Sequence, residues 1–187
     1  SIIYKPQKEM ELFAPFGPTM GYYRMPDELV EELNSKMSDK LSDYSDKLVG
    51  KVSEELAFDD EIKLIAQKGL GQFVGKYQNY TEHRNSMGAK SLDTENNNYA
   101  LQIVSGWFVR QFENEYNPIH HHSGHVSGVG YLKVPKNLGS VSENKKVNER
   151  GSLALIHGSV NLFSNATYVI KPEVGDFYLF PNYLLHS

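Results

Sequence analysis

Four of the seven histidines of this 187-residue chain lie within six residues, at His120, His121, His122 and His125. Side chains alternate along an extended strand, so His120 and His122 are expected on one face, about 6.5 Å apart, with His121 on the other. Two imidazoles at this spacing can hold one metal ion. The third ligand must come from elsewhere, and His186 is the natural candidate because it follows an apolar run that is typical of a strand.

The residue types alone leave the identity of the metal open. Neutral imidazole suits zinc, copper, iron and nickel, and three histidines with a water form a hydrolytic zinc site. Two histidines with a carboxylate form the usual non-haem iron(II) site. No Asp or Glu stands two residues after His120, so the spacing does not choose between these chemistries.

Composition excludes several classes of protein. Without cysteine the chain has no disulfide framework, thiolate zinc site, iron–sulfur cluster or cysteine nucleophile. Nineteen Lys and Arg residues against 23 Asp and Glu give a net charge of −4, which argues against a nucleic-acid or anionic-membrane partner. No apolar run reaches the ~20 residues of a membrane span, and the first residues do not form a secretory signal. We therefore expect a cytoplasmic protein of one domain, residues 1–187.

The first half of the chain, residues 1–98, is predicted to be a mostly helical supporting region. One helix opens at Pro26 and a second near Asp59, each with acidic residues in its first turn. Residues 41–58 are predicted to be partly helical, and residues 81–98 to form a polar loop.

The second half, residues 99–187, has the alternating and β-branched pattern of strands separated by turns that are rich in Gly, Pro and Asn. The predicted strands are residues 100–112, 127–134, 152–156, 166–170 and 176–180. Short strands of this kind predict a sandwich, barrel or jelly roll. Residues 136–150 are predicted to form an exposed hairpin, which together with residues 81–98 could close over a substrate.

The order of several motifs resembles the 2-oxoglutarate/Fe(II)-dependent oxygenases, in particular a small bacterial and phage group. The matching segments are Trp107–Phe112, Tyr116–Gly124, Ser127–Pro135, Gly151–Leu153 and Pro172–Ser187. They contain an N-P-x-H-x-H segment, an S-G-V-x-Y-L strand and an F-P-x-x-x-x-H-S ending. The resemblance implies a mainly β fold, a double-stranded β-helix (jelly roll) with a metal at one mouth and supporting helices.

The resemblance also implies roles for the histidines. It makes His120 the first ligand and His186 the distal one. His122 falls where many relatives have an aspartate, and the i, i+2 spacing favours it as the remaining ligand. His125 is the alternative if the strand bends, and a carboxylate such as Glu115 or Asp176 would be another.

A co-substrate anchor is expected as well. In the family a basic residue several positions after the distal histidine pairs with the far carboxylate of 2-oxoglutarate. The sequence ends at Ser187, so the resemblance implies either that this residue lies in a tail beyond Ser187 or that another residue is the anchor. Within the sequence, the candidates are Arg110, whose guanidinium can pair with a carboxylate, Lys133, and the hydroxyl of Tyr131.

The reaction implied by the resemblance uses Fe(II), 2-oxoglutarate and O2. Decarboxylation of 2-oxoglutarate to succinate is coupled to hydroxylation of a small molecule or a protein side chain. The competing interpretations are a cupin-like metal-dependent isomerase or hydrolase and a non-catalytic jelly-roll binding module.

Overall fold

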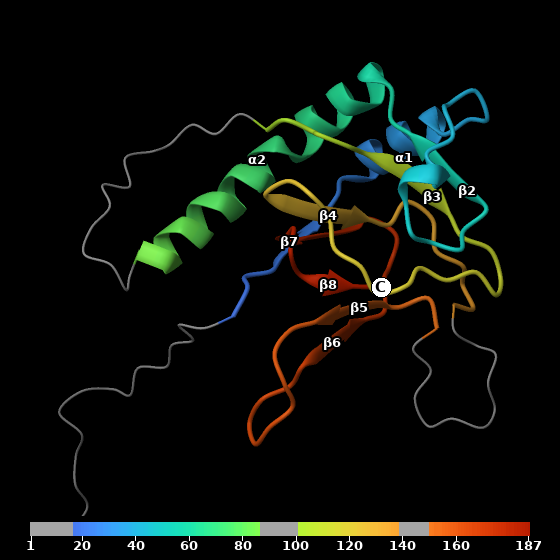
Figure 1. Ribbon diagram of the computed structural model, residues 1–187. Helices are drawn as coiled ribbons and strands as arrows, with labels where there is room; N and C mark the ends of the chain where they lie inside the picture. The colour runs from blue at the N-terminus through green and yellow to red at the C-terminus, as the bar shows by residue number, and fades with distance from the viewer. Residues whose placement is uncertain (1–16, 87–100, 139–149) are drawn as a thin grey trace, which may run out of the picture.

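The computed structural model describes residues 17–86, 101–138 and 150–187 (Figure 1). Short antiparallel strands and two α-helices dominate this part of the chain. In order, the elements are β1 (Gly21–Arg24), α1 (Asp27–Lys36), a 3-10 turn (Ser45–Lys47), β2 (Glu54–Ala57), α2 (Asp60–Ser86), β3 (Trp107–Arg110), β4 (Val126–Gly130), β5 (Leu153–Ile156), β6 (Thr167–Ile170), β7 (Asp176–Pro181) and β8 (Leu185–His186).

The strands form three antiparallel sheets. Two of them have three strands each, in the orders β1-β7-β4 and β6-β5-β8, and β2 pairs with β3 in the third. In Figure 1, α2 lies along one side of the β1-β7-β4 sheet, and β5, β6 and β8 lie on its other side.

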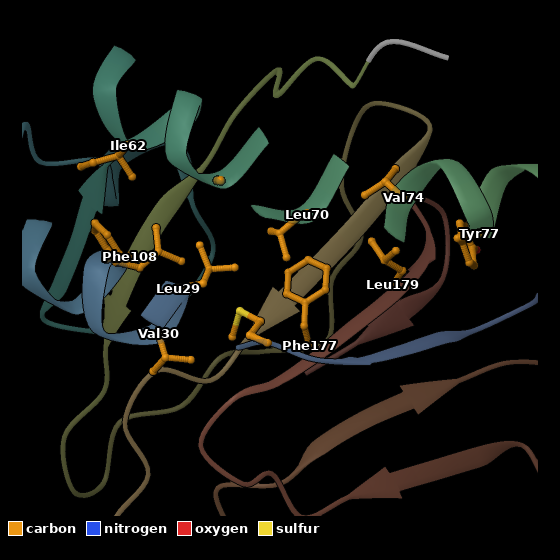
Figure 2. Close-up of a cluster of buried hydrophobic side chains, with 12 residues drawn as sticks. Leu29, Val30, Ile62, Leu70, Val74, Tyr77, Phe108, Phe177 and Leu179 are labelled. Atoms are coloured by element: carbon orange, nitrogen blue, oxygen red, sulfur yellow. The ribbon is translucent and has the colours of Figure 1, made fainter. Parts of the chain in front are cut away.

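The central strand β7 is buried on both faces because its side chains alternate between two cores. Phe177 and Leu179 pack against the helices, and Figure 2 shows both beside the labelled side chains of α2. Tyr178 and Phe180 face the second sheet. Phe180 belongs to an inner cluster, against which Tyr178 packs, and the cluster consists of Leu153, Leu155, Ile170, Phe180 and Leu184.

Local sequence explains how α2 begins and how it packs. The Asp59 carboxylate accepts the backbone N–H of Ile62 at 2.9 Å, which caps the first turn. Gly69 allows α1 to approach closely, since a Cβ at this position would lie 2.6 Å from Cδ2 of Leu29. The helix therefore passes through a glycine that its propensity alone would disfavour.

The structure confirms the two helices and the β-rich second half, and it corrects the prediction for the first half. Residues 1–98 are not simply helical, because they contribute β1 and β2 to sheets. Residues 41–58 form a 3-10 turn and a strand rather than a partial helix, and α2 continues over residues 81–86, where a loop was predicted. Residues 87–98 of that loop and 139–149 of the predicted hairpin lie outside the described residues.

Within the described ranges, none of the helices combines the length and the apolar character that crossing a membrane requires.

Candidate metal centre

Three imidazoles meet where the segment before β4 pairs with β8. His120 and His186 form an antiparallel bridge, with N···O distances of 2.9 and 3.0 Å in the two directions. This pairing brings together residues that are far apart in the chain. Ring nitrogens of His120, His122 and His186 lie within 4.8 Å of one another.

Backbone carbonyls set the orientation of two of these rings. Nδ1 of His120 donates to the Pro118 carbonyl at 2.7 Å, and Nδ1 of His186 donates to the Leu184 carbonyl at 2.9 Å. Because a carbonyl oxygen only accepts, the proton of each ring is on Nδ1, and Nε2 carries the lone pair that could bind a metal. Histidine ligands in metal sites are commonly oriented in this way.

Burial favours the neutral form of two of these imidazoles. His186 is only 6 % exposed, and burial lowers its pKa, as do His120 and His121 nearby. For His122, burial first and the neighbouring His186 and His120 next lower the pKa to about 4. Metal binding requires the unprotonated imidazole, so these groups are ready to bind a cation at neutral pH.

The spacing of the nitrogens also fits one metal ion. Nε2 of His122 and Nε2 of His186 are 3.0 Å apart. Two nitrogens that each lie about 2.1 Å from one ion, at about 90° to each other, are separated by about 3.0 Å. Imidazole nitrogens suit iron and zinc, so the donor set agrees with either metal.

Aromatic side chains surround the three rings. The Phe180 ring lies 4.8 Å from that of His186, and Phe180 is 1 % exposed. On the other side, the Trp107 ring of β3 lies 5.4 Å from that of His122. Phe180 thus contributes to the burial of His186, whereas His120 and His122 are partly exposed.

One known protein family matches the segment that contains the three histidines. The sequence model of the family described as "Putative 2OG-Fe(II) oxygenase" matches residues 105–187. The match covers less than half of the chain, and it supports membership of the 2OG-Fe(II) oxygenase superfamily for this segment. No curated protein and no solved structure matched the chain. The family match confirms the resemblance seen in the motifs.

The other candidate ligands of the oxygenase segment are engaged elsewhere or exposed. His125 is exposed, and its backbone carbonyl accepts the N–H of Asn182 at 3.2 Å. The Glu115 carboxylate accepts the backbone N–H of Phe112 at 2.8 Å. The Asp176 carboxylate accepts the Tyr22 hydroxyl at 2.9 Å. Among the described residues, the group that could hold a metal ion thus consists of three histidines.

The three candidates for the 2-oxoglutarate anchor occupy different environments. Arg110 stands three positions after Trp107 on β3, so the two side chains point to opposite faces, and Arg110 forms an ion pair with Glu54 at 2.8 Å. Lys133 is exposed. Tyr131 packs against the inner cluster, and burial raises the pKa of its hydroxyl. Of the three, Tyr131 alone lies in the core between the two sheets.

A small cavity beside the histidines contains residues that the sequence analysis missed. Its lining includes Glu55, Trp107 and Asn117 together with His120 and His122. Trp107 is the only tryptophan of the chain, which is a signal that could have singled it out. Glu55 gave no signal, because it lies in a polar stretch that was predicted to be partly helical.

Proposed function

We propose that the protein is a non-haem Fe(II), 2-oxoglutarate-dependent dioxygenase that hydroxylates its substrate. The observation that carries this proposal is the convergence of three imidazoles, two of them with Nε2 fixed as the free nitrogen, inside a segment of the 2OG-Fe(II) oxygenase superfamily. The sheets β1-β7-β4 and β6-β5-β8 would then be the two sides of a jelly roll that encloses the inner cluster.

In this proposal each side chain of the site has a role. His120, His122 and His186 hold the iron, and their neutral state leaves the charge of the cation for anionic 2-oxoglutarate. Tyr131 donates its hydroxyl to a carboxylate of 2-oxoglutarate between the sheets. When bound, iron with 2-oxoglutarate and O2 supplies the oxidation that couples decarboxylation to succinate with hydroxylation of a C–H bond.

The substrate would be a small molecule or a protein side chain that enters beside Trp107. The net charge of −4 does not favour a polynucleotide. The cavity next to the histidines measures about 70 Å³, which is well below the ~300–1,000 Å³ of a pocket for a whole drug-sized ligand. It can therefore receive a head group rather than an entire substrate.

Anaerobic titration with Fe(II) and 2-oxoglutarate tests the proposal. We expect the weak visible charge-transfer band of the chelate in the wild type and in His125→Ala, and its loss in His122→Ala. His122→Asp, which recreates the two-histidine, one-carboxylate set, should restore the band. Absence of the band in protein that demonstrably holds iron would refute the proposal.

The ligand set gives specific support to one other function, a cupin-like zinc or manganese enzyme. Three imidazoles are the ligands of hydrolytic zinc sites, and the described group contains no carboxylate. Metal analysis of purified protein, combined with an assay of succinate formation, separates the two functions. Stoichiometric zinc without 2-oxoglutarate turnover would favour the cupin-like enzyme.

A further inference from the structure

Polar side chains form part of the wall of the cavity beside the histidines. Glu55 belongs to β2 and lies directly across from Val109 of β3. Residues paired in this way share a face of the sheet, and so does Trp107, two positions before Val109. The two-stranded sheet therefore presents Glu55 and Trp107 to the same cavity, while Glu54 and Arg110 form their ion pair on its other face.

Two hydrogen-bond acceptors in this wall are buried without a partner. Glu55 is 1 % exposed, and its Oε2 has no hydrogen-bond partner among the described residues. The same holds for Oδ1 of Asn117. The two side chains converge, because a Cβ added at Gly50 would lie 3.2 Å from Oδ1 of Asn117 and 3.3 Å from Oε1 of Glu55. A buried acceptor left unpaired destabilises the fold, so a ligand that supplies a hydrogen-bond donor would be favoured here.

No cation of the described residues neutralises Glu55. Lys47 also lines the cavity, but its ammonium lies over the Tyr44 ring, 5.1 Å from the centroid. Burial, and then the nearby carboxylates of Asp43 and Glu115, raise the pKa of Glu55. The negative charge of the Glu55 carboxylate is thus unfavourable at this buried position, and a positively charged ligand would stabilise it.

We propose that Glu55 and Asn117 bind a primary ammonium group of the substrate and so select amine-bearing substrates for the neighbouring metal centre. An ammonium group offers three N–H donors and a positive charge, which matches two unpaired acceptors, one of them an oxygen of a carboxylate. The aromatic face of Trp107 adds a favourable surface for a cation. The cavity of about 70 Å³ has room for such a head group. This inference rests on the proposed oxygenase function for the reaction, but the ammonium site itself can be tested without metal.

Trp107 provides the reporter, because it is the sole tryptophan and lines the cavity. Chelator-treated protein is titrated with n-propylammonium, 1-propanol or propionate at constant ionic strength while tryptophan fluorescence is followed. We expect a saturable change with n-propylammonium alone. Glu55→Gln should weaken its binding roughly tenfold or more, as the loss of a charge-assisted hydrogen bond predicts. Glu54→Gln, one residue away on the opposite face, is the matched control and should bind as the wild type does.

Several results would overturn the inference. An equal response to 1-propanol would mean that the cavity recognises only the alkyl chain. Unchanged binding in Glu55→Gln would mean that the ammonium contacts the imidazole lone pairs instead. Circular dichroism establishes whether Glu55→Gln is folded. Glu55→Asp keeps the charge and should therefore bind n-propylammonium more tightly than Glu55→Gln does. If both variants lose binding equally, the carboxylate charge is not the recognition element.

The two proposals fail separately. If the wild type forms the Fe(II)–2-oxoglutarate band but does not respond to n-propylammonium, the ammonium site is wrong and the oxygenase function stands. If n-propylammonium binds in a Glu55-dependent way but no band forms, the site is real and the oxygenase function is wrong.

Discussion

Metal binding should raise the melting temperature of the protein, and the rise should depend on three particular histidines. The candidate ligands come from two segments that the bridge between His120 and His186 already pairs, with N···O distances of 2.9 and 3.0 Å. Little ordering is therefore needed when the ion binds. At a free metal concentration one hundred times the Kd, a ligand that binds only the folded chain stabilises it by about 2.7 kcal/mol. For a chain of this length that corresponds to a rise of about 5–11 °C.

Loss of one ligand should remove most of this rise. Changes to residues that merely support a ligand lower metal affinity about 10–100-fold, and removal of a ligand costs at least as much. A hundredfold loss in His122→Ala leaves about 0.4 kcal/mol at the same metal concentration, which is a rise of about 1 °C. His125→Ala should keep the full rise, because His125 is exposed and outside the ligand group.

Differential scanning fluorimetry with anaerobic Fe(II), or with Zn²⁺ as a redox-stable substitute, measures this effect. Each variant is compared with itself in chelator, so that any change in the stability of the fold cancels. A metal-induced rise in His122→Ala equal to that of the wild type would refute the assignment of His122 as a ligand. A loss of the rise in His125→Ala would show that the exposed histidine, rather than the buried group, holds the ion.

Three further predictions concern charge, packing and the co-substrate. In the presence of a chelator, the free energy of unfolding should fall as the pH drops from about 6.5 toward 4, because His122 of the folded chain, with a pKa lowered to about 4, stays neutral while the same residue of the unfolded chain takes up a proton. Urea titrations should show a shallower pH dependence of this free energy in His122→Gln. In urea titrations, Gly75→Ala should stabilise the protein by about 0.5–1 kcal/mol, since a Cβ at this position of α2 meets nothing within 4 Å. Gly69→Ala should destabilise the protein, since its Cβ would lie 2.6 Å from a leucine of α1. Tyr131→Phe should raise the KM for 2-oxoglutarate about 2–12-fold, the value of one hydrogen bond, and Lys133→Ala, at an exposed position, should leave it unchanged in a succinate assay.

Local patterns in the sequence were sufficient for elements whose signals are local. The helix opening near Asp59 was predicted from its acidic first turn, and the structure adds the capping hydrogen bond to Ile62. The strands of the second half followed from alternation and from their Pro and Gly boundaries. Short strands such as β2 escaped prediction because they are stabilised by pairing with β3, which is distant in sequence and leaves no periodic signal in four residues.

The residues of the candidate site also differ in whether local sequence was enough to predict them. Spacing within the chain was enough to suggest His120 and His122, because alternation on an extended segment is a local property. The placement of Glu55 and Asn117 in one cavity could not be predicted, since it depends on how the β2–β3 sheet packs beside the histidines. The environment of Arg110 was equally inaccessible, because its face of β3 is decided by pairing with Glu54.

The ring orientations of the three imidazoles are set in different ways, two by local contacts and one by contacts with residues distant in the sequence. His120 and His186 each donate from Nδ1 to the carbonyl two residues earlier, at distances of 2.7 and 2.9 Å, so each ring is oriented by its own segment. His122 is held through its backbone, which exchanges hydrogen bonds with Asn182 at 3.0 and 3.1 Å, and through the nearby ring of Trp107. Its ring orientation is thus a product of tertiary packing. Substitutions of Asn182 or Trp107 should therefore weaken metal binding through His122, while the two locally oriented ligands keep their geometry.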